Sequence, residues 1–340
     1  MRYRTLFTCG AGLLVACSTE QTPTEPAALR DTPATPPAAA VSNTWTLRAP
    51  RSAGGWFETF AGTAPNAAGH SIVYVFGGTD GQGTGLGTGA YNVSTDTWTG
   101  GRVTLDVFGA NGVGKIGNRL YFAGGYNDVE TPGSFTNRLW AYDYANNRLI
   151  QKAPLPIFGA EGVTGVISGK LYVLPGACSG DRYPDLPGYC AEEPTRRLFR
   201  YDPATNTWMS RRQAPHVHRA GAAAVIGGKL YVVGGFDGFD PVAALDVYDP
   251  GTNAWHTLAP MPESGRAIGA ALQGRLHVLV GTRHHVFDPG TNRWRTLAPS
   301  QYAHDALLKV QLDGRARLLA VGGNHGPNLD MPNPTELYTP

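Results

Sequence analysis

The hydrophobic positions of this chain gather in short runs separated by polar, glycine-rich turns. The clearest unit begins with small residues over 221–226 and continues with an apolar run over 229–233. Two further runs follow at 244–248 and 255–258. Runs this short, bounded by turn residues, are typical of strands rather than helices. The pattern therefore predicts four antiparallel strands in each unit.

The polar turn between the third and fourth runs has nearly the same sequence each time. It reads YDPATNTW, YDPGTNAW and FDPGTNRW at 201–208, 248–255 and 287–294. These residues suit a hairpin, because Asp accepts backbone N–H groups, Pro fixes φ and Asn tolerates the left-handed region. The units recur roughly every fifty residues, and units of this length must stack to bury their apolar faces. Short, evenly spaced strands favour a radial β-propeller, with the small residues of the first strand at its crowded axis.

A glycine pair, or its remnant, ends the second run of each unit. The six copies are Gly77-Gly78, Gly124-Gly125, Pro175-Gly176, Gly234-Gly235, Val280-Gly281 and Gly322-Gly323. The pair, the later aromatic residue and the Trp, as at Gly234-Gly235, Tyr248 and Trp255, resemble the kelch repeat. This resemblance covers nearly all of residues 43–340 and implies an all-β, six-bladed kelch-type propeller. The departures are Pro175 and Val280 for a first glycine and Leu149 for the Trp.

The two ends of the repeat region complement each other. The last unit stops after its third strand, at 336–340, whereas the stretch 45–47 resembles a fourth strand without a sheet. Pairing the two would close the ring and remove two open strand edges. We therefore expect one domain over 43–340, closed by the strand at Trp45. The alternative is that this strand stays disordered.

Composition agrees with a β-rich domain and narrows the class of partner. The chain has 45 Gly and 26 Pro, which suits many turns. Its formal charge is +2, and loss of residues 1–16 would remove two of the 28 basic side chains, leaving as many as the 26 acidic ones. No basic field that would attract nucleic acid remains.

The N-terminus has the features of a targeting segment. Arg2 and Arg4 precede an apolar stretch over 6–16 that is too short to span a bilayer. The sequence Leu-Val-Ala-Cys ending at Cys17 resembles a bacterial lipobox. That resemblance implies a lipoprotein signal peptide over 1–16, acylation of Cys17 and an exported lipoprotein of the cell envelope. In a Gram-negative cell it would lie in the outer membrane or at the cell surface. The alternative is an ordinary secretory peptide with Cys17 uninvolved.

The segment after this signal, residues 17–42, is rich in Thr, Pro and Ala and poor in bulky apolar side chains. Such a composition predicts a disordered, semi-extended tether. Beyond it only Cys178 and Cys190 remain, and an oxidising compartment favours a disulfide between them. The bond would restrain the polar loop that the two cysteines bracket.

Function should lie in the unrepeated residues. The segments that lead into each first strand and the loops between second and third strands are expected on one face, where loops carry binding residues. The candidate binding residues are Glu58, Asn111, Glu161, His218, Arg219, Arg266, His304 and Asp305. Together they would form a mixed-charge basin at the axis, suited to a polar ligand such as a sugar or a carboxylate. The alternative is that they are solvated loop residues.

Two catalytic alternatives stay open. Sialate mutarotases resemble the expected architecture, and Glu161, Arg219, Arg266 and His304 would then act on a small sugar or sugar acid. A metal-dependent enzyme would use histidines of the same face: His216, His218, His284, His304 and His325. Galactose oxidases, with a seven-unit ring and a Tyr–Cys link, fit less well. No motif of a cofactor-dependent enzyme is evident, so we expect no cofactor.

The sequence therefore favours a binding module over an enzyme. We expect a monomeric propeller, held at the membrane only by a lipid anchor, that binds a glycan or an envelope protein through its loop-rich face.

Overall fold

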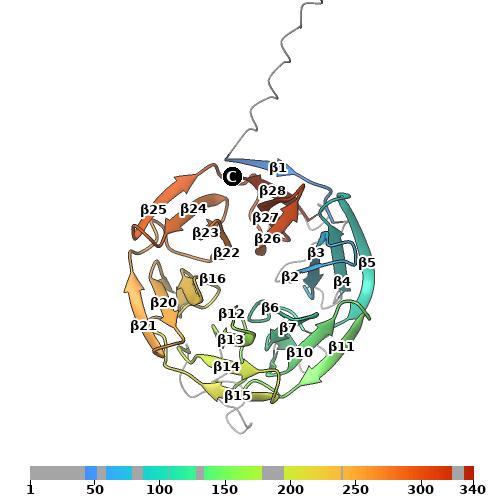
Figure 1. The fold of residues 1–340 in the computed structure, drawn as a ribbon. Helices are drawn as coiled ribbons and strands as arrows, with labels where there is room; N and C mark the ends of the chain where they lie inside the picture. Colours follow the sequence, from blue (N-terminus) through green and yellow to red (C-terminus); the bar gives the residue numbers. More distant parts are fainter. Residues whose placement is uncertain are drawn as a thin grey trace, which may run out of the picture. The chain divides into compact units, whose positions relative to one another are not determined.

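The strands of the computed structural model form six four-stranded antiparallel sheets, arranged as blades around one axis (Figure 1). The structure describes residues 43–51, 59–78, 87–105, 107–127, 134–177, 195–238, 240–323 and 333–340. All of these residues belong to one compact structural unit, Val41–Pro340. The predicted six-bladed β-propeller is confirmed.

Each blade runs outward from the axis in the order of its strands. Blade 1 contains β2 (Phe60–Pro65), β3 (Ser71–Phe76), β4 (Gly87–Asn92) and β5 (Thr97–Thr104). Blade 2 contains β6 (Val113–Ile116), β7 (Arg119–Ala123), β10 (Leu139–Asp143) and β11 (Arg148–Lys152). Blade 3 contains β12 (Val163–Ile167), β13 (Lys170–Leu174), β14 (Phe199–Asp202) and β15 (Thr207–Ser210).

The remaining blades follow the same plan. Blade 4 contains β16 (Ala222–Ile226), β17 (Lys229–Val233), β20 (Leu245–Asp249) and β21 (Ala254–Leu258). Blade 5 contains β22 (Ile268–Leu272), β23 (Arg275–Val280), β24 (Arg283–Asp288) and β25 (Arg293–Leu297). Blade 6 contains β26 (Ala306–Leu312), β27 (Arg315–Val321), β28 (Thr335–Thr339) and β1 (Thr44–Leu47). In the described ranges no helix has the length and apolar character needed to cross a membrane.

Blade 6 closes the ring with strands from both ends of the repeat region. β1 pairs antiparallel with β28, and Trp45 lies opposite Tyr338. The closure predicted from the orphan Trp strand is therefore confirmed, and it leaves neither strand with the open edge that it would have alone.

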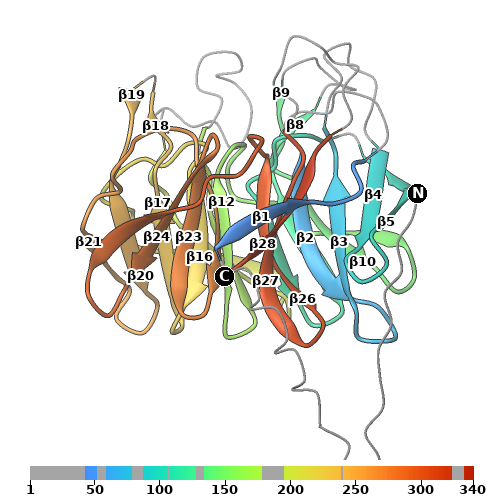
Figure 2. The same cartoon turned by 90° about the horizontal axis from the view of Figure 1, so that it is seen from above.

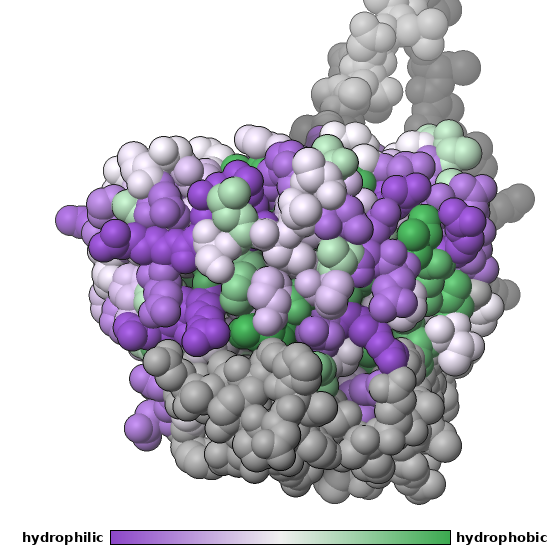
Figure 3. Space-filling model, turned by 90° about the horizontal axis from the view of Figure 1, so that it is seen from below, coloured by the Kyte–Doolittle hydropathy of each residue, from purple (hydrophilic) through white to green (hydrophobic). Residues whose placement is uncertain are grey.

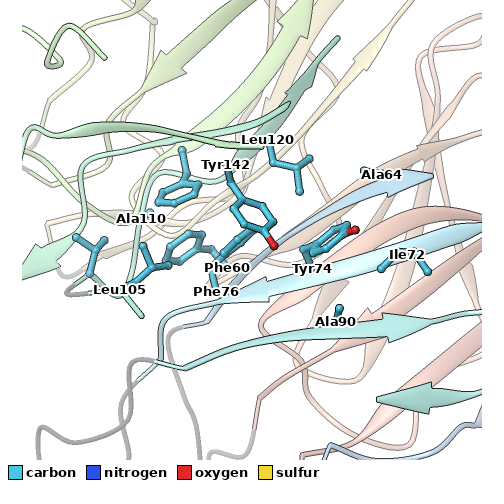
Figure 4. Close-up of a cluster of buried hydrophobic side chains, with 12 residues drawn as sticks. Phe60, Ala64, Ile72, Tyr74, Phe76, Ala90, Leu105, Ala110, Leu120 and Tyr142 are labelled. Carbon is cyan, nitrogen blue, oxygen red and sulfur yellow. The ribbon is translucent and has the colours of Figure 1, made fainter. Parts of the chain in front are cut away.

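The hydrophobic core lies between neighbouring blades. Between blades 1 and 2, for example, Phe60 packs against Phe122, and Phe76 packs against Tyr142. Phe60, Phe76 and Tyr142 are labelled in Figure 4. Small residues on the innermost strands allow this close approach. A side chain added at Gly62 of β2 would collide with Val113 of β6 in the next blade, as the crowded axis led us to expect.

An indole clamp at the repeated turn position joins five of the six blades to the blade before them. In blade 4, Asn253 has a φ of 52°, and its Oδ1 accepts both the Tyr248 hydroxyl at 2.7 Å and the Arg212 amide at 3.1 Å. The Trp255 indole then donates to the Arg212 carbonyl at 2.8 Å. Arg212 lies just after the last strand of blade 3, so the motif holds the seam between the two blades.

The same clamp recurs at four other seams. The indole donors and their acceptors are Trp98 to Ala49, Trp208 to Ala153, Trp294 to Ala259 and Trp45 to Ala298. Blade 2 has Leu149 in place of the Trp, and an aliphatic side chain cannot donate this bond. The seam between blades 1 and 2 is therefore built differently.

The two flat faces of the ring differ. The hairpins β8–β9 (Tyr126–Asn127 with Ser134–Phe135) and β18–β19 (Phe236–Asp237 with Asp240–Pro241) stand on one face (Figure 2). The lead-in segments reach the same face, because Phe108 bridges Tyr126 and Arg219 bridges Phe236. We call this the loop face; its lead-in segments are 107–112, 159–162, 216–221, 263–267 and 303–305. The opposite turn face carries the tight turns, among them 66–70, 93–96 and 144–147.

The outer wall has a mixed surface where the structure describes it. On the part of the wall shown in Figure 3, hydrophilic side chains are interspersed with smaller hydrophobic areas. Scattered exposed apolar residues, such as Met209 at 49% exposure, are ordinary for a protein surface.

Candidate functional site

A cavity of about 190 Å³ opens at the axis, between the lead-in segments and the innermost strands. Glycine, alanine and aliphatic side chains supply most of its lining, and its charged side chains are Glu161, Arg266 and Asp305. Three of the predicted binding residues therefore lie at one cavity, although they come from blades 3, 5 and 6.

Glu161 is the centre of the charged group. Its Oε2 accepts a hydrogen bond from Nε of Arg219 at 2.6 Å, and its Oε1 lies 3.8 Å from Nη1 of Arg266. Burial alone would lower the pKa of Arg219, but the bond and charge of Glu161 outweigh it and raise that pKa. The guanidinium therefore stays charged. The carboxylate is only 10% exposed, against 36% and 42% for the two arginine side chains.

The backbone of Glu161 is held in an unusual conformation. Its φ is 52°, as at the equivalent positions Gly109 (58°) and Ala220 (54°), each one residue beyond a bridge at the loop face. Its amide donates to Gly109 O at 3.0 Å, and its carbonyl accepts the Ala220 amide at 2.6 Å. These bonds link the lead-in segments of blades 2, 3 and 4 around the axis. Left-handed backbone at a residue other than Gly, Asn or Asp costs roughly 1–2 kcal/mol and concentrates at functional sites.

Asp305 lines the cavity and also closes the ring. Its Oδ2 accepts the Thr59 amide at 3.3 Å and the Thr59 hydroxyl at 3.0 Å. Thr59 precedes blade 1, so the bonds join blade 6 to blade 1. The side chain is therefore held in place beside the cavity.

Asn111 lies beside the axis but is fully buried. Its Nδ2 donates to Ala123 O and Gly159 O, both at 3.0 Å, and its Oδ1 accepts the Gly162 amide at 2.8 Å. These bonds tie blade 2 to blade 3. The structure thus places Asn111 in a structural bridge rather than on the cavity wall.

His218 and His304 occupy matching places inside blades 4 and 6. His218 places Nδ1 2.9 Å from Gly234 O and Nε2 3.1 Å from Asp246 Oδ2. His304 places Nδ1 3.2 Å from Gly322 O and Nε2 2.8 Å from Glu336 Oε2. Both imidazoles are buried, and their ring nitrogens are occupied by bonds within the blade. The expected convergence of His304 with Glu161, Arg219 and Arg266 is therefore not found.

The two acids that bind these histidines, Asp246 and Glu336, were not predicted from the sequence. Burial alone would raise the pKa of Asp246, but hydrogen bonds from His218, Thr257 and His216 outweigh it and hold that pKa below its ordinary value. Asp246 lies on β20 and Glu336 on β28, where each looks like one polar position in an alternating strand. No local signal connects them to a histidine in a lead-in segment.

The histidines of the metal alternative lie in separate environments. His216 and His218 share Asp246 in blade 4. His284 packs in blade 5, with its Nε2 3.0 Å from Nδ1 of His277, and His304 lies in blade 6. Across the described ranges, no group of three or more His, Cys, Asp or Glu side chains is placed to hold a metal ion.

Several predicted residues lie outside the described residues. They are Cys17 with the signal and tether, Glu58, the cysteines Cys178 and Cys190, and His325. The predictions of lipidation, the disulfide and their share of the binding basin stay as predictions.

Comparison with known proteins agrees with the fold. A family model described as Kelch motif matches residues 219–262. The human Kelch repeat and BTB domain-containing protein 12 is 29% identical over 126 residues, which cover 36% of this chain and 19% of that protein. Kelch-like protein 25 of Xenopus tropicalis is 27% identical over 172 residues, covering 48% of this chain and 27% of that protein. The chain thus spans less than a third of the length of these relatives.

A solved structure extends the comparison to nearly the whole ring. The chain titled "Structure of YjhT" superposes with a TM-score of 0.65 at 16% sequence identity, covering 84% of this chain and 94% of that one. At this identity the likeness concerns the fold alone. The repeated turn, the motif match and the six closed blades together identify the chain as a kelch-repeat β-propeller.

Proposed function

We propose that this propeller is a binding module that holds a carboxylate of its partner at the axial cavity of the loop face. The observation that carries the proposal is the placement of Arg266. Its Nη1 lies 3.8 Å from Glu161, beyond hydrogen-bonding distance, and within the described part of the chain its guanidinium donates no hydrogen bond. A guanidinium matches the two oxygens of a carboxylate in spacing and charge.

Glu161 prepares the site rather than filling it. Its carboxylate lines the cavity, accepts a hydrogen bond from Arg219 and lies beside Arg266, so both guanidinium groups are placed next to this carboxylate. Asp305 also lines the cavity, so the two acids balance the two arginines in charge, and the carboxylate of the partner would be held by the free donors of Arg266 rather than by a net charge of the site. The small cavity admits a single acidic group or sugar ring, so the partner would be a carboxylate-bearing glycan or an envelope protein presenting an acidic side chain.

The proposal includes display at the cell envelope. The lipobox-like sequence at Cys17 and the Pro-rich segment after it support a lipid tether, and the proposal takes the propeller as a monomer whose loop face meets its partner. Metabolic labelling with a fatty acid should mark the wild-type protein but not Cys17→Ser. Equal labelling of both proteins would remove the anchor from the proposal without affecting the axial site.

Binding at the axis can be measured directly. Titration calorimetry with N-acetylneuraminic, glucuronic and galacturonic acids, and a microarray of acidic glycans, should reveal acidic ligands of this site. The matching neutral sugars should not bind there. Arg266→Ala should weaken binding at least tenfold, or by about 1.4 kcal/mol. Arg148→Ala, on the exposed outer strand β11, is the matched control and should bind as the wild type does. Acidic ligands that bind Arg266→Ala normally would refute the proposal.

A second candidate function is an enzyme that acts on a small sugar acid at the same cavity. It is favoured by one observation, that two carboxyl side chains, Glu161 and Asp305, line the cavity together with Arg266. Such groups could exchange protons with a ligand held by the arginine. Saturation-transfer NMR on the anomers of the same acids should then show faster exchange with wild type than with Glu161→Gln. If the wild-type protein did not accelerate anomer exchange, the enzyme proposal would be refuted and the binding module would remain as the proposed function.

A further inference from the structure

The seam between blades 1 and 2 contains a groove of about 600 Å³ on the turn face, opposite the axial site. We propose that this groove is a second binding site and that it takes an uncharged saccharide. The inference goes beyond the proposed function, because it concerns another face, another ligand class and none of the same residues.

The groove lies where the repeat departs from its own pattern. At this seam Leu149 stands at the position of the clamping Trp, and Tyr144 stands at the position of the turn proline. Blades 3, 4 and 5 have Pro203, Pro250 and Pro289 there. The substitution to Tyr therefore adds an aromatic ring beside the groove at the seam that lacks the indole clamp.

The groove has a buried apolar floor and an exposed polar rim. Its floor is formed by Ile72, Tyr74 and Ala90, which are 7%, 4% and 3% exposed. Figure 4 shows these three side chains at the end of the core cluster farthest from Leu105. The rim includes the exposed Thr97 and Thr99 of β5. A pocket of this volume is in the range of small-ligand sites.

Tyr144 supplies a surface on which a sugar ring can stack. It is half-buried, and its ring lies 5.9 Å from that of Tyr74 with 31° between the two planes. Packing against Tyr74 fixes the Tyr144 ring before any ligand arrives. The apolar C–H face of a pyranose can cover such a ring, while the sugar hydroxyls turn toward the polar rim.

Two asparagines that line the groove, Asn66 and Asn92, carry amide groups that can bind those hydroxyls. Oδ1 of Asn66 accepts the amides of Ala68 and His70 at 3.0 and 2.9 Å. Oδ1 of Asn92 accepts the Ser94 amide at 3.0 Å. Because the oxygens are engaged, each amide group is fixed, and neither Nδ2 has a partner among the residues that the structure describes. Both residues line the groove, so these amino groups can donate to a ligand.

The absence of charge in the lining selects the ligand class. The lining side chains are aromatic, aliphatic, amide or hydroxyl, together with one proline. A uronic or sialic acid would find no cation here, whereas a neutral sugar finds an aromatic ring and several donors and acceptors. An apolar peptide would leave the rim donors without partners.

The repeat supplies test variants that suit its own fold. Tyr144→Pro restores the residue of blades 3 to 5, and Asn92→Asp restores the Asp found there as Asp202, Asp249 and Asp288. Each change removes one element of the site, the ring or the amide donor. Circular dichroism and thermal unfolding should show that both variants fold as the wild type does.

Binding is measured on the full-length protein with maltose, cellobiose, lactose and N,N′-diacetylchitobiose, by saturation-transfer NMR followed by calorimetry. We expect at least one of these disaccharides to bind, with each variant weakening it at least tenfold. Arg266→Ala should leave it unchanged, which separates this site from the axial one. Failure of all four disaccharides to bind, or equal binding by Tyr144→Pro, would overturn the proposal. A ligand preference for glucuronic acid at this groove would do the same.

Discussion

Nε2 of His218 lies 3.1 Å from Oδ2 of Asp246, and both side chains are fully buried inside blade 4. The carboxylate also accepts hydrogen bonds from Thr257 and His216. A buried carboxylate is tolerated because these donors replace the water that it has lost. His218, which the sequence suggested as a binding residue, therefore stabilises the fold instead.

Substitution of His218 should therefore destabilise the propeller strongly. His218→Ala leaves Asp246 buried with fewer donors, and the expected loss in the free energy of unfolding is about 3–5 kcal/mol. Urea titration followed by Trp fluorescence measures it. His216→Ala is the matched control: His216 is 43% exposed, so water can replace its imidazole beside Asp246, and this variant should cost less stability than His218→Ala. If the two variants were equally stable, the buried pair would not hold the blade.

The turn clamp predicts an order of stabilities at the seam between blades 3 and 4. Asn253→Ala removes both the Tyr248 and the Arg212 bonds and leaves alanine at a φ of 52°. Asn253→Gly removes the same bonds but accommodates that φ, so it should be more stable than the alanine variant by about 1 kcal/mol. Trp255→Phe should cost about 1 kcal/mol for the lost indole bond, plus some packing. Equal stability of the Gly and Ala variants would contradict the role of the left-handed backbone.

Glu161 allows the cost of the strained backbone to be separated from its charge. Glu161→Ala and Glu161→Gly both lose the ion pairs with Arg219 and Arg266, but only Gly occupies a φ of 52° without strain. The Gly variant should unfold with a free energy about 1 kcal/mol higher than that of the Ala variant. Both should lose carboxylate binding if Glu161 holds the two arginines in place. Thermal unfolding and calorimetry on the same samples test the two effects.

The fold could be predicted because the features that determine it can be seen directly in the sequence. Glycine pairs, turn residues and Trp positions repeat along the chain, and the missing fourth strand at one end matches the extra strand with Trp45 at the other. The site could be predicted only in part. Glu161, Arg266 and Asp305 do meet at the axis, whereas His218 lies next to Arg219 in the same lead-in segment and points into the blade.

The difference between those neighbours depends on distant partners. Asp246 is 28 residues from His218 in sequence, and Glu336 is 32 residues from His304. Only the folded blade brings each acid to its imidazole. The groove beside Tyr144 was missed for another reason: in the sequence its departures from the repeat looked like weak copies, and its lining comes from two blades.

The buried His277–His284 pair predicts a pH dependence of stability. His277 Nδ1 lies 3.0 Å from His284 Nε2, so one nitrogen donates and the other accepts when both rings are neutral. Burial, with Arg275 and Arg295 nearby, lowers the pKa of His277 to about 4. Burial and the charge of His277 lower the pKa of His284 to about 3.

In the unfolded chain His277 and His284 therefore bind protons near pH 6.5, whereas in the folded protein they bind them only near pH 3–4. Stability from this pair is complete above pH 6.5 and falls as the pH falls below it. Lowering the pH from 7 to 5 should reduce the free energy of unfolding by about 2 kcal/mol for each of the two histidines. This range lies above the pH at which the carboxylates begin to titrate. Urea titrations at these two pH values should show the loss in wild type. The double variant His277→Leu with His284→Phe should show a much smaller one. A wild type equally stable at both would mean that the folded protein protonates this pair as readily as the unfolded chain does.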